Sequence, residues 1–338
     1  MTDRVGALPS LSGALPTHDP ALEAALRRGL DDVEQLLAEA VSGVHASFGD
    51  ASGHLMLAGG KRFRPLLTVL ASQLGVGAGP DVIRAAAVVE LTHLASLYHD
   101  DVMDEAALRR GTASANAQFG NTVAILTGDL LFARASSIVA ELGPEAVKVQ
   151  ARTFERLVTG QTRETVGPGA GEDPVAHYLA VLADKTGALI ATSGRFGAEF
   201  AGCSPEQVAV LVEYGERIGV AFQLADDLID LASETGQSGK TPGTDLREGI
   251  PTLPVLLART STDPADAELL GLLAGDLTDD VAHARALELL RAHPSLEAAR
   301  VQTQAWADGA REALAPLPAG PVRDALDALA ENVVSRSG

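Results

Sequence analysis

The sequence has few of the residues that mark several common protein classes. It contains a single cysteine, Cys203, in 338 residues, which excludes an internal disulfide and favours a reducing compartment. Aromatic residues make up only 4% of the chain although hydrophobic residues make up 46%, so Ala, Leu and Val dominate and favour helices over sheets. The 26 basic residues are outnumbered by 45 acidic ones, and the net charge of −19 argues against nucleic acid as a partner.

Targeting and nucleotide-binding signals are also missing. No charged and then apolar leader opens the sequence, and no uninterrupted run of about 18 apolar residues appears. We therefore expect neither secretion nor a membrane span, and we expect a cytoplasmic protein. There is no GxxxxGK[ST] segment and no GxGxxG before a helix, so nucleotide chemistry is not indicated.

What the sequence does contain is a succession of long helical patterns. Residues 1–20, which include three prolines and two glycines, predict a flexible N-terminal tail. From residue 21 onward, apolar residues recur at helical spacing in segments separated by Gly and Pro clusters. No strand pattern, hairpin signal or linker between domains stands out. We therefore predict an all-α fold, with one large helical bundle over residues 21–338.

Two aspartate clusters of the form DDxxD are the most informative feature of the chain, at residues 100–104 and 226–230. If each stretch is helical, its first and last aspartates lie one turn apart on one face. Carboxylates packed this closely repel one another, by about 4 kcal/mol for unit charges 4 Å apart at an effective dielectric of 20. Such clusters indicate a bound cation, and carboxylate oxygens suit Mg²⁺, which combines one or two of them with substrate phosphates.

Basic residues gather near these acids. The segment Gly59-Gly60-Lys61-Arg62-Phe63-Arg64-Pro65 has two glycines that permit close backbone approach, followed by three cations. Arg109-Arg110 begins five residues after Asp104, and arginine is suited to bidentate phosphate contacts. Lys240 stands between Gly239 and Thr241 after the second cluster. Taken alone, the segment around Lys61 is equally typical of a basic helix start with solvated side chains. The segment around Lys240, taken alone, is more typical of an ordinary surface loop.

Further polar residues share helical faces with the clusters. His93 lies two turns before Asp100, although a lone histidine in an apolar helix is more often a core residue. Gln223 lies three residues before Asp226, and Lys185-Thr186 occupies another helical stretch. Together these residues indicate a diphosphate held by divalent metal between acidic helices, with a hydrocarbon in the apolar interior.

The whole set of motifs closely resembles that of the trans-isoprenyl diphosphate synthases (polyprenyl synthetases), and of their long-chain members in particular. The matching residues between about 50 and 260 are, in order, GGKRFRP at 59–65, His93, the first DDxxD, Arg109-Arg110-Gly111, Gly128-Asp129, Gly160-Gln161, Lys185-Thr186, Phe222-Gln223, the second DDxxD and Gly239-Lys240. This resemblance implies a helical bundle around a central hydrophobic cavity. It also implies head-to-tail condensation of isopentenyl diphosphate with an allylic diphosphate.

The resemblance further implies roles for individual residues. Three magnesium ions on the allylic diphosphate would be held by Asp100, Asp104 and Asp226, with Asp101, Asp227 and Asp230 as nearby ligands or supports. The cations that bind the same diphosphate would be Arg109, Lys185 and Lys240. The residues that hold isopentenyl diphosphate would be Lys61, Arg64, His93 and Arg110. Thr186 and Gln223 would face the developing allylic cation.

Product length in this family depends on a tunnel beside the first Asp-rich helix. Bulky residues four and five positions before its first aspartate form a floor, and here these positions hold Ser96 and Ala95. We therefore expect an open tunnel and a long-chain, all-trans product. Two alternatives stay open: small residues that only allow tight helix packing, and a deeper floor that stops growth at C15 to C20.

The sequence also departs from the family in places and leaves other functions to weigh. Many relatives carry a lysine where this chain has Ile250, and Arg247 is a candidate to replace its charge.

A class I terpene cyclase is an alternative function, but such an enzyme would normally have an Asn/Ser/Glu triad in place of the second DDxxD, which this chain retains. The catalytic subunit of a two-component synthase is a further alternative. By resemblance we expect a homodimer with at most transient membrane contact, whereas the allylic starter and the downstream pathway are not determined.

Overall fold

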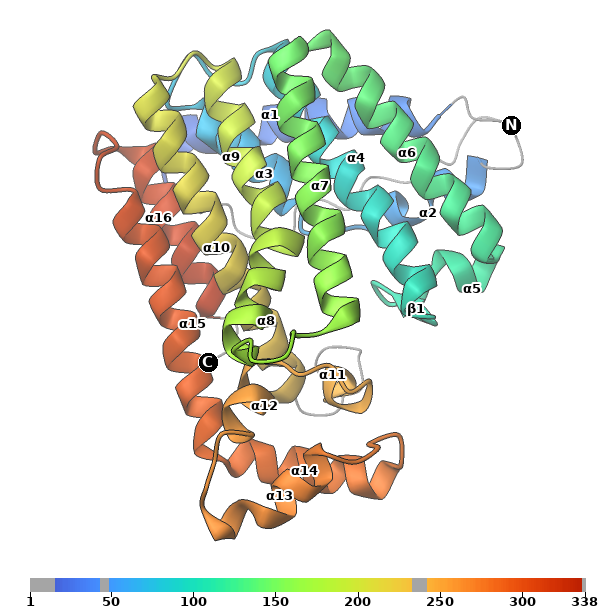
Figure 1. The fold of residues 1–338 in the computed structure, drawn as a ribbon. Helices are drawn as coiled ribbons and strands as arrows, with labels where there is room; N and C mark the ends of the chain where they lie inside the picture. Colours follow the sequence, from blue (N-terminus) through green and yellow to red (C-terminus); the bar gives the residue numbers. More distant parts are fainter. Residues whose placement is uncertain (1–15, 43–48, 233–241, 336–338) are drawn as a thin grey trace. The chain divides into compact units, whose positions relative to one another are not determined.

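The structure is a computed structural model that describes residues 16–42, 49–232 and 242–335 (Figure 1). Within these ranges the regular structure is helical apart from one pair of two-residue strands, which confirms the predicted all-α fold. The chain divides into two compact units. Unit 1 contains residues 1–154, 189–212 and 316–328, and unit 2 contains residues 155–188, 213–315 and 329–338. Most of the predicted N-terminal tail lies outside the described residues.

Unit 1 is built on α4, which carries the first Asp-rich motif at its C-terminal end. Its described elements are α1 (Pro20–Val41), α2 (Gly49–Leu57), α3 (Phe63–Ser72), α4 (Pro80–Met103), β1 (Leu108–Arg109), β2 (Thr112–Ala113), α5 (Ala115–Phe119), α6 (Asn121–Glu141), α9 (Ala188–Phe200), and parts of α7 (Pro144–Val166), α10 (Pro205–Ala232) and α16 (Pro321–Val334). Helix α4 packs against α1, α3 and α6 (Figure 1). Its residues from Val82 to Leu91 are almost all buried, as expected for a helix that is apolar on all sides.

Helix α1 begins where the sequence predicted. Asp19 is the N-cap, and its side chain accepts a hydrogen bond from Leu22 N at 2.8 Å, while Pro20 occupies the first turn. The buried residues of α1 recur at helical spacing: Leu22, Leu26, Leu30, Val33 and Leu37. Each fully buried side chain of this kind stabilises the fold by about 1.5–3 kcal/mol.

A small hairpin follows the first Asp-rich motif. Strands β1 and β2 pair antiparallel, and both residues of the turn, Arg110 (φ 53°) and Gly111 (φ 77°), have positive φ. Turns of this kind match the twist of the flanking strands. The sequence does not reveal this hairpin, because strands of two residues are too short to show an alternating pattern of polar and apolar residues. The hairpin fixes the direction in which Arg109 and Arg110 leave the backbone.

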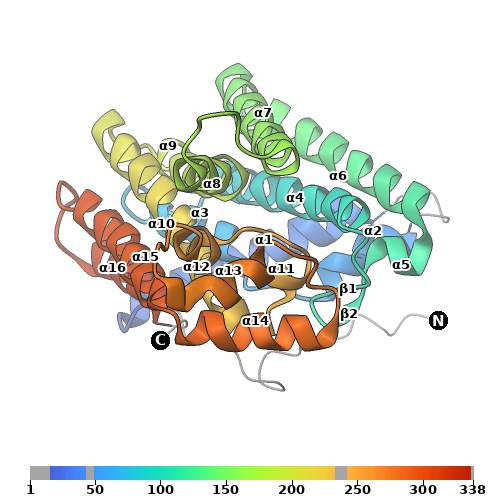
Figure 2. The ribbon, with the colours of Figure 1, turned by 60° about the horizontal axis from the view of Figure 1, so that its bottom comes forward.

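Unit 2 carries the second Asp-rich motif at the end of α10. Its other described elements are the second half of α7, the end of α16, α8 (Pro174–Leu182), the π-helix η1 (Ala183–Gly187), α11 (Thr244–Arg247), α12 (Leu253–Ala258), the 3₁₀-helix η2 (Pro264–Asp266), α13 (Ala267–Leu273), α14 (Asp280–Ala292) and α15 (Pro294–Ala313). Helix α12 packs on α8 and α15, and α13 packs on α14 (Figure 2). An apolar cluster of this unit includes Tyr178, Leu224 and Leu228, and so extends to the Asp-rich end of α10.

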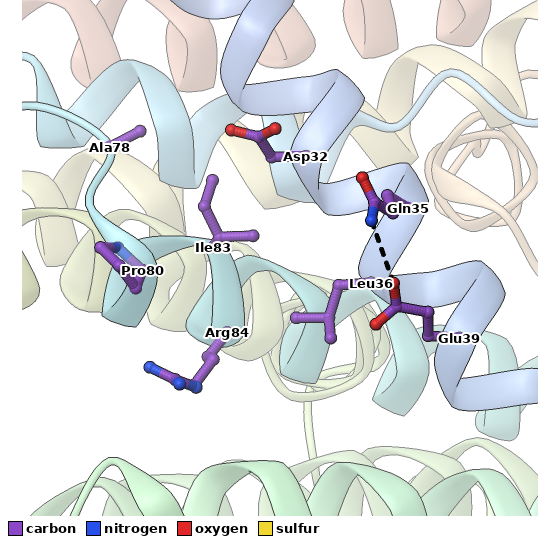
Figure 3. Close-up of a pocket in the computed structure, with 8 residues that line it drawn as sticks. All are labelled: Asp32, Gln35, Leu36, Glu39, Ala78, Pro80, Ile83 and Arg84. Carbon is purple, nitrogen blue, oxygen red and sulfur yellow. Dashed lines mark hydrogen bonds between the residues drawn. The ribbon is translucent and has the colours of Figure 1, made fainter.

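An open groove of about 350 Å³ lies in unit 1 between α1 and the start of α4 (Figure 3). Its lining combines acidic, basic and apolar side chains, namely Asp32, Gln35, Leu36, Glu39, Ala78, Pro80, Ile83 and Arg84. Gln35 donates a hydrogen bond to Glu39 at 3.0 Å across one turn of α1. None of the residues predicted for the active site lines this groove.

Candidate active site

The first Asp-rich motif closes helix α4, and its three aspartates differ in exposure. Asp104 caps the helix with its N–H bonded to the carbonyl of Asp100 at 2.8 Å, which places these two residues one turn apart as predicted. Asp104 is exposed and Asp100 is half-buried, whereas Asp101 is fully buried. Oδ1 of Asp101 accepts a hydrogen bond from Nε of Arg109 at 2.6 Å. The middle aspartate therefore anchors the hairpin that carries the two arginines.

Arg110 holds the glycine-rich loop before α3. Its Nη1 donates to the carbonyl of Leu55 at 2.9 Å and also to the carbonyl of Gly59. A Cβ at Gly60 would lie 3.0 Å from Cζ of Arg110, so glycine at this position makes room for the guanidinium. The sequence indicated only that these glycines permit a close approach to the backbone. In the structure, the group that approaches Gly60 is the side chain of Arg110.

A group of positive charges lies around Arg64, His93 and Arg110. Burial lowers the pKa of Arg64 to about 10, and the charge of Arg110 acts in the same direction against that of Glu90. Burial also lowers the pKa of His93 well below its usual value, with further contributions from Arg64, Arg110, Arg109 and Arg62. His93 is therefore neutral at pH 7 while the arginines remain charged. Nε of Arg64 is buried without a hydrogen-bond partner. Positive groups held close together in this way fit a bound diphosphate.

Arg62 has a different environment from its neighbours in the basic segment. Its guanidinium is buried, donates to Glu90 at 2.9 Å and to the carbonyl of Met56 at 3.2 Å, and also pairs with Glu34. Its backbone lies in the left-handed region, with φ of 45°. Lys61, by contrast, is exposed. Arg62 therefore pairs with two acidic residues of the protein itself, whereas its neighbours Lys61 and Arg64 are the residues predicted to bind substrate.

In unit 2, Lys185 and Thr186 lie on the π-helix η1, a rare geometry that is frequent at functional sites. Lys185 pairs with Glu164 on α7. The hydroxyl of Thr186 donates to Oε1 of Gln223 at 3.4 Å. Nε2 of Gln223 in turn donates to Oδ1 of Asp227 at 2.9 Å. The structure therefore brings Thr186 and Gln223 together beside the second Asp-rich motif.

The second Asp-rich motif repeats the pattern of a buried middle aspartate. The hydroxyl of Tyr178 donates to Oδ2 of Asp227, a partner that the sequence did not reveal. Burial raises the pKa of Asp227 to about 6, with the charges of Asp226 and Asp230 adding to the effect and the bonds from Tyr178 and Gln223 opposing it. Asp230 accepts hydrogen bonds from Thr244 N at 3.3 Å and Asp245 N at 3.1 Å. The first turn of α11 is therefore bonded to this motif.

Two further residues, Lys240 and Arg247, were assigned to the site from the sequence. Lys240 lies outside the described residues. Arg247, the candidate substitute for the missing lysine, pairs with Asp280 at 2.9 Å and donates to the carbonyl of Thr278 at 3.0 Å.

The carboxylates of the two Asp-rich motifs form an incomplete set of oxygen ligands. Among the described residues, no three His, Cys, Asp or Glu side chains converge into a complete metal site. In each motif, however, the first and last aspartates carry their carboxylates one turn apart, and the second oxygen of buried Asp101 has no hydrogen-bond partner. An incomplete all-oxygen set suits Mg²⁺, which takes its remaining ligands from water and substrate phosphate. The residues therefore fit magnesium bound together with a diphosphate.

The two residues predicted to control product length differ in their packing. Ala95 is fully buried, and a Cβ at Gly128 of α6 would lie 3.1 Å from its carbonyl oxygen. Close approach of α4 and α6 thus accounts for glycine at position 128. Ser96 is half-buried, and its hydroxyl donates to the carbonyl of His93 at 2.8 Å. Of the two, Ser96 is the residue with an accessible side chain.

Comparisons with known proteins identify the family of this chain. Residues 45–298 match the sequence profile of the family described as polyprenyl synthetase. The chain is 51% identical to the nonaprenyl diphosphate synthase of Mycobacterium tuberculosis, over 95% of this chain and 96% of that protein. It is 34% identical to the octaprenyl diphosphate synthase of Escherichia coli, over 91% of this chain and 99% of that protein.

A solved structure has a similar fold over nearly the whole chain. The geranylgeranyl pyrophosphate synthase of Corynebacterium glutamicum, complexed with calcium and isoprenyl diphosphate, superimposes with a TM-score of 0.86 at 46% identity and covers 95% of this chain and 99% of that one. The profile match and the identities extend across both Asp-rich motifs and the basic residues between them. The chain therefore belongs to the polyprenyl synthetase family.

Proposed function

We propose that this protein is a trans-prenyltransferase that condenses isopentenyl diphosphate with an allylic diphosphate and makes a long-chain, all-trans polyprenyl diphosphate. The observation that carries the proposal is the 51% identity, over nearly the whole chain, to a nonaprenyl diphosphate synthase. The positive group around Arg64 and Arg110 and the carboxylates of the two motifs supply the charges that two diphosphates and their metal ions require.

Isopentenyl diphosphate would be held by Lys61, Arg64, His93 and Arg110. The guanidinium of Arg110 is fixed by the carbonyls of Leu55 and Gly59, so it is oriented before the substrate arrives. His93 is neutral at pH 7 and can donate one hydrogen bond to a phosphate oxygen without adding charge. Such preorganised donors bind an anion with little further loss of conformational entropy.

The allylic diphosphate would be held with Mg²⁺ by the outer aspartates Asp100, Asp104, Asp226 and Asp230, and we propose three ions per site. Bound there, magnesium would neutralise the diphosphate and make it a better leaving group. Arg109, Lys185 and Lys240 would add positive charge to the same diphosphate. The buried aspartates Asp101 and Asp227 are bonded to Arg109 and Tyr178, respectively, and would support the site rather than carry the main coordination.

Catalysis would consist of positioning and charge stabilisation. As the allylic carbon–oxygen bond breaks, the oxygen atoms of Thr186 and Gln223 would face the positive charge that develops on the allyl group. The double bond of isopentenyl diphosphate then attacks this carbon, and a proton is lost to the departing diphosphate. No covalent protein intermediate is needed, because the arrangement of the reactants and the fixed charges provides the acceleration.

Product length is tested at Ser96. Because its side chain is half-buried, Ser96→Phe is expected to add bulk beside the growing chain and to shorten the product, whereas the control Ser96→Ala keeps the wild-type length. Product lengths are measured by chromatography of the dephosphorylated products. The same distribution in both variants and the wild type would refute a floor at this position.

A short-chain synthase is the second candidate, and it is favoured by the 46% identity to a geranylgeranyl pyrophosphate synthase. The deciding experiment incubates the purified protein with Mg²⁺, labelled isopentenyl diphosphate and allylic starters of increasing length. Products that extend well beyond C20 support the long-chain proposal, and a stop at C15 or C20 supports the short-chain one. Absence of elongation would refute the proposed function for this chain acting alone and would indicate a missing partner subunit. A cyclic hydrocarbon formed from the starter alone would indicate a cyclase.

We also propose a cytoplasmic homodimer that meets membranes only transiently. Helix α6 is long and apolar enough to cross a membrane, and its most apolar stretch is only 33% buried within the chain. Leu126 of α6 and Phe154 of α7 are exposed, and Phe154 packs on Phe132 of α6 with ring centres 4.4 Å apart. A second copy that covers this face would bury it. Leu126→Glu is expected to lower the mass measured by analytical ultracentrifugation. The control Val281→Glu, at an exposed position of α14, is expected to leave that mass unchanged.

A further inference from the structure

One guanidinium in unit 2 connects the turn that carries Lys185 and Thr186 to helix α10. Nε of Arg156 on α7 donates to Oδ1 of Asp184 at 2.9 Å, and Nη2 donates to Oε2 of Glu216 at 3.1 Å and to the carbonyl of Ala183 at 3.2 Å. Nη1 makes a further bond to Glu216. All five donor positions of an arginine lie in one plane, so such a fork restricts the orientation of the groups that it joins.

The turn held in this way is the π-helix η1, residues 183–187. The carbonyl of Ala183 accepts both the N–H of Ala188, which defines the π-turn, and the guanidinium of Arg156. Return to an ordinary α-helix would shift the register by one residue, or about 100° around the axis at 3.6 residues per turn. Such a rotation would carry Thr186 away from Gln223 and Lys185 away from its present position.

Two glycines show how tightly the backbone of this turn is enclosed. A Cβ at Gly160, one turn after Arg156 on α7, would lie 2.7 Å from the backbone nitrogen of Lys185. A Cβ at Gly187 would lie 3.2 Å from the carbonyl oxygen of Glu216 on α10. The turn is thus in backbone contact with both helices, and Arg156 bonds the acidic side chains next to these contacts.

We propose that Arg156 is a positioning residue that stabilises the π-helical turn and thereby orients Lys185 and Thr186 toward the allylic substrate. The inference rests on the function proposed above for these two residues. Arg156 acts through them. Its loss should therefore affect use of the allylic diphosphate more than use of isopentenyl diphosphate, whose proposed ligands Arg64, His93 and Arg110 belong to unit 1.

The test compares the kinetics of Arg156→Met and Arg156→Lys with those of Arg163→Met. Arg163 is the matched control, because it binds the other oxygen of Asp184 at 2.7 Å from the same helix, and its side chain is about as exposed as that of Arg156, at 47% against 39%. We expect both Arg156 variants to lose roughly 10–100-fold in kcat/KM for the allylic diphosphate, since displacements of about 1 Å can cost that much. Their KM for isopentenyl diphosphate should stay within about twofold, and Arg163→Met should stay within about twofold throughout.

The lysine variant separates positioning from charge. It keeps the positive charge between Asp184 and Glu216 but cannot form the planar fork, so wild-type kinetics in Arg156→Lys would overturn the proposal. An equal rise in KM for both substrates would also overturn it, because that result indicates a general structural defect. Thermal unfolding verifies that each variant is folded, and Arg156→Lys decides alone if Arg156→Met does not fold. An inactive wild type would refute the proposed function itself, and this inference with it.

Discussion

Replacement of Arg62 by methionine tests whether this arginine is a structural residue inside the basic segment. Methionine keeps most of the aliphatic volume but removes the bonds to Glu34, Glu90 and the carbonyl of Met56. The side chain of Glu90 is only 3% exposed, so the substitution leaves a buried carboxylate without its hydrogen-bonded counter-charge. Loss of one partner from such a pair typically costs about 3–5 kcal/mol. Because Arg64 and Arg110 also lie near Glu90, we expect the lower end of this range, about 3 kcal/mol.

The assay is urea denaturation followed by circular dichroism. The control is Arg27→Met, which removes an exposed i,i+4 pair with Glu23 and should cost less than about 1 kcal/mol. The double variant Arg62→Met/Glu90→Gln should be less destabilised than Arg62→Met alone, because it no longer buries an unpaired charge. A loss below about 1 kcal/mol in Arg62→Met, or no recovery in the double variant, would refute the reasoning.

Three further predictions concern the site. Burial and the nearby arginines hold the pKa of His93 well below 6.5, so below about pH 6.5 the unfolded chain binds a proton at this residue that the folded chain does not. Lowering the pH from 7.5 to 5.5 should therefore destabilise the wild type by about 1.4 kcal/mol more than it destabilises His93→Gln. Urea denaturation at both pH values measures this difference. Equal losses would contradict a neutral His93. Gly160→Ala places a Cβ against the backbone of Lys185 and should lower turnover at least about tenfold at a stability cost of about 1–3 kcal/mol, so wild-type turnover would show that the turn tolerates displacement. Asp100→Ala should lower the rate by several orders of magnitude while the circular dichroism spectrum stays unchanged, and near-normal turnover would refute its assignment as a magnesium ligand.

Much of this protein follows from its sequence. The all-α fold is predicted by apolar residues that recur at helical spacing from residue 21 onward, because an amphipathic helix must bury one face. The alignment of Asp100 with Asp104 and the proximity of Gln223 to Asp227 also follow from helical spacing alone. The order of the motifs was sufficient to indicate the family.

Tertiary structure decided which side chain each polar group contacts. No sequence spacing shows that Arg62 pairs with Glu34 and Glu90, that Tyr178 donates to Asp227, or that Arg110 packs over Gly60. These partners are separated along the chain, and their contacts depend on how helices pack and on which groups become buried. No local sequence pattern predicts the π-helical turn at Lys185, because Arg156 on another helix stabilises its geometry. The sequence thus determined which residues can carry the chemistry, and packing determined which of them are exposed to a substrate and which support the others.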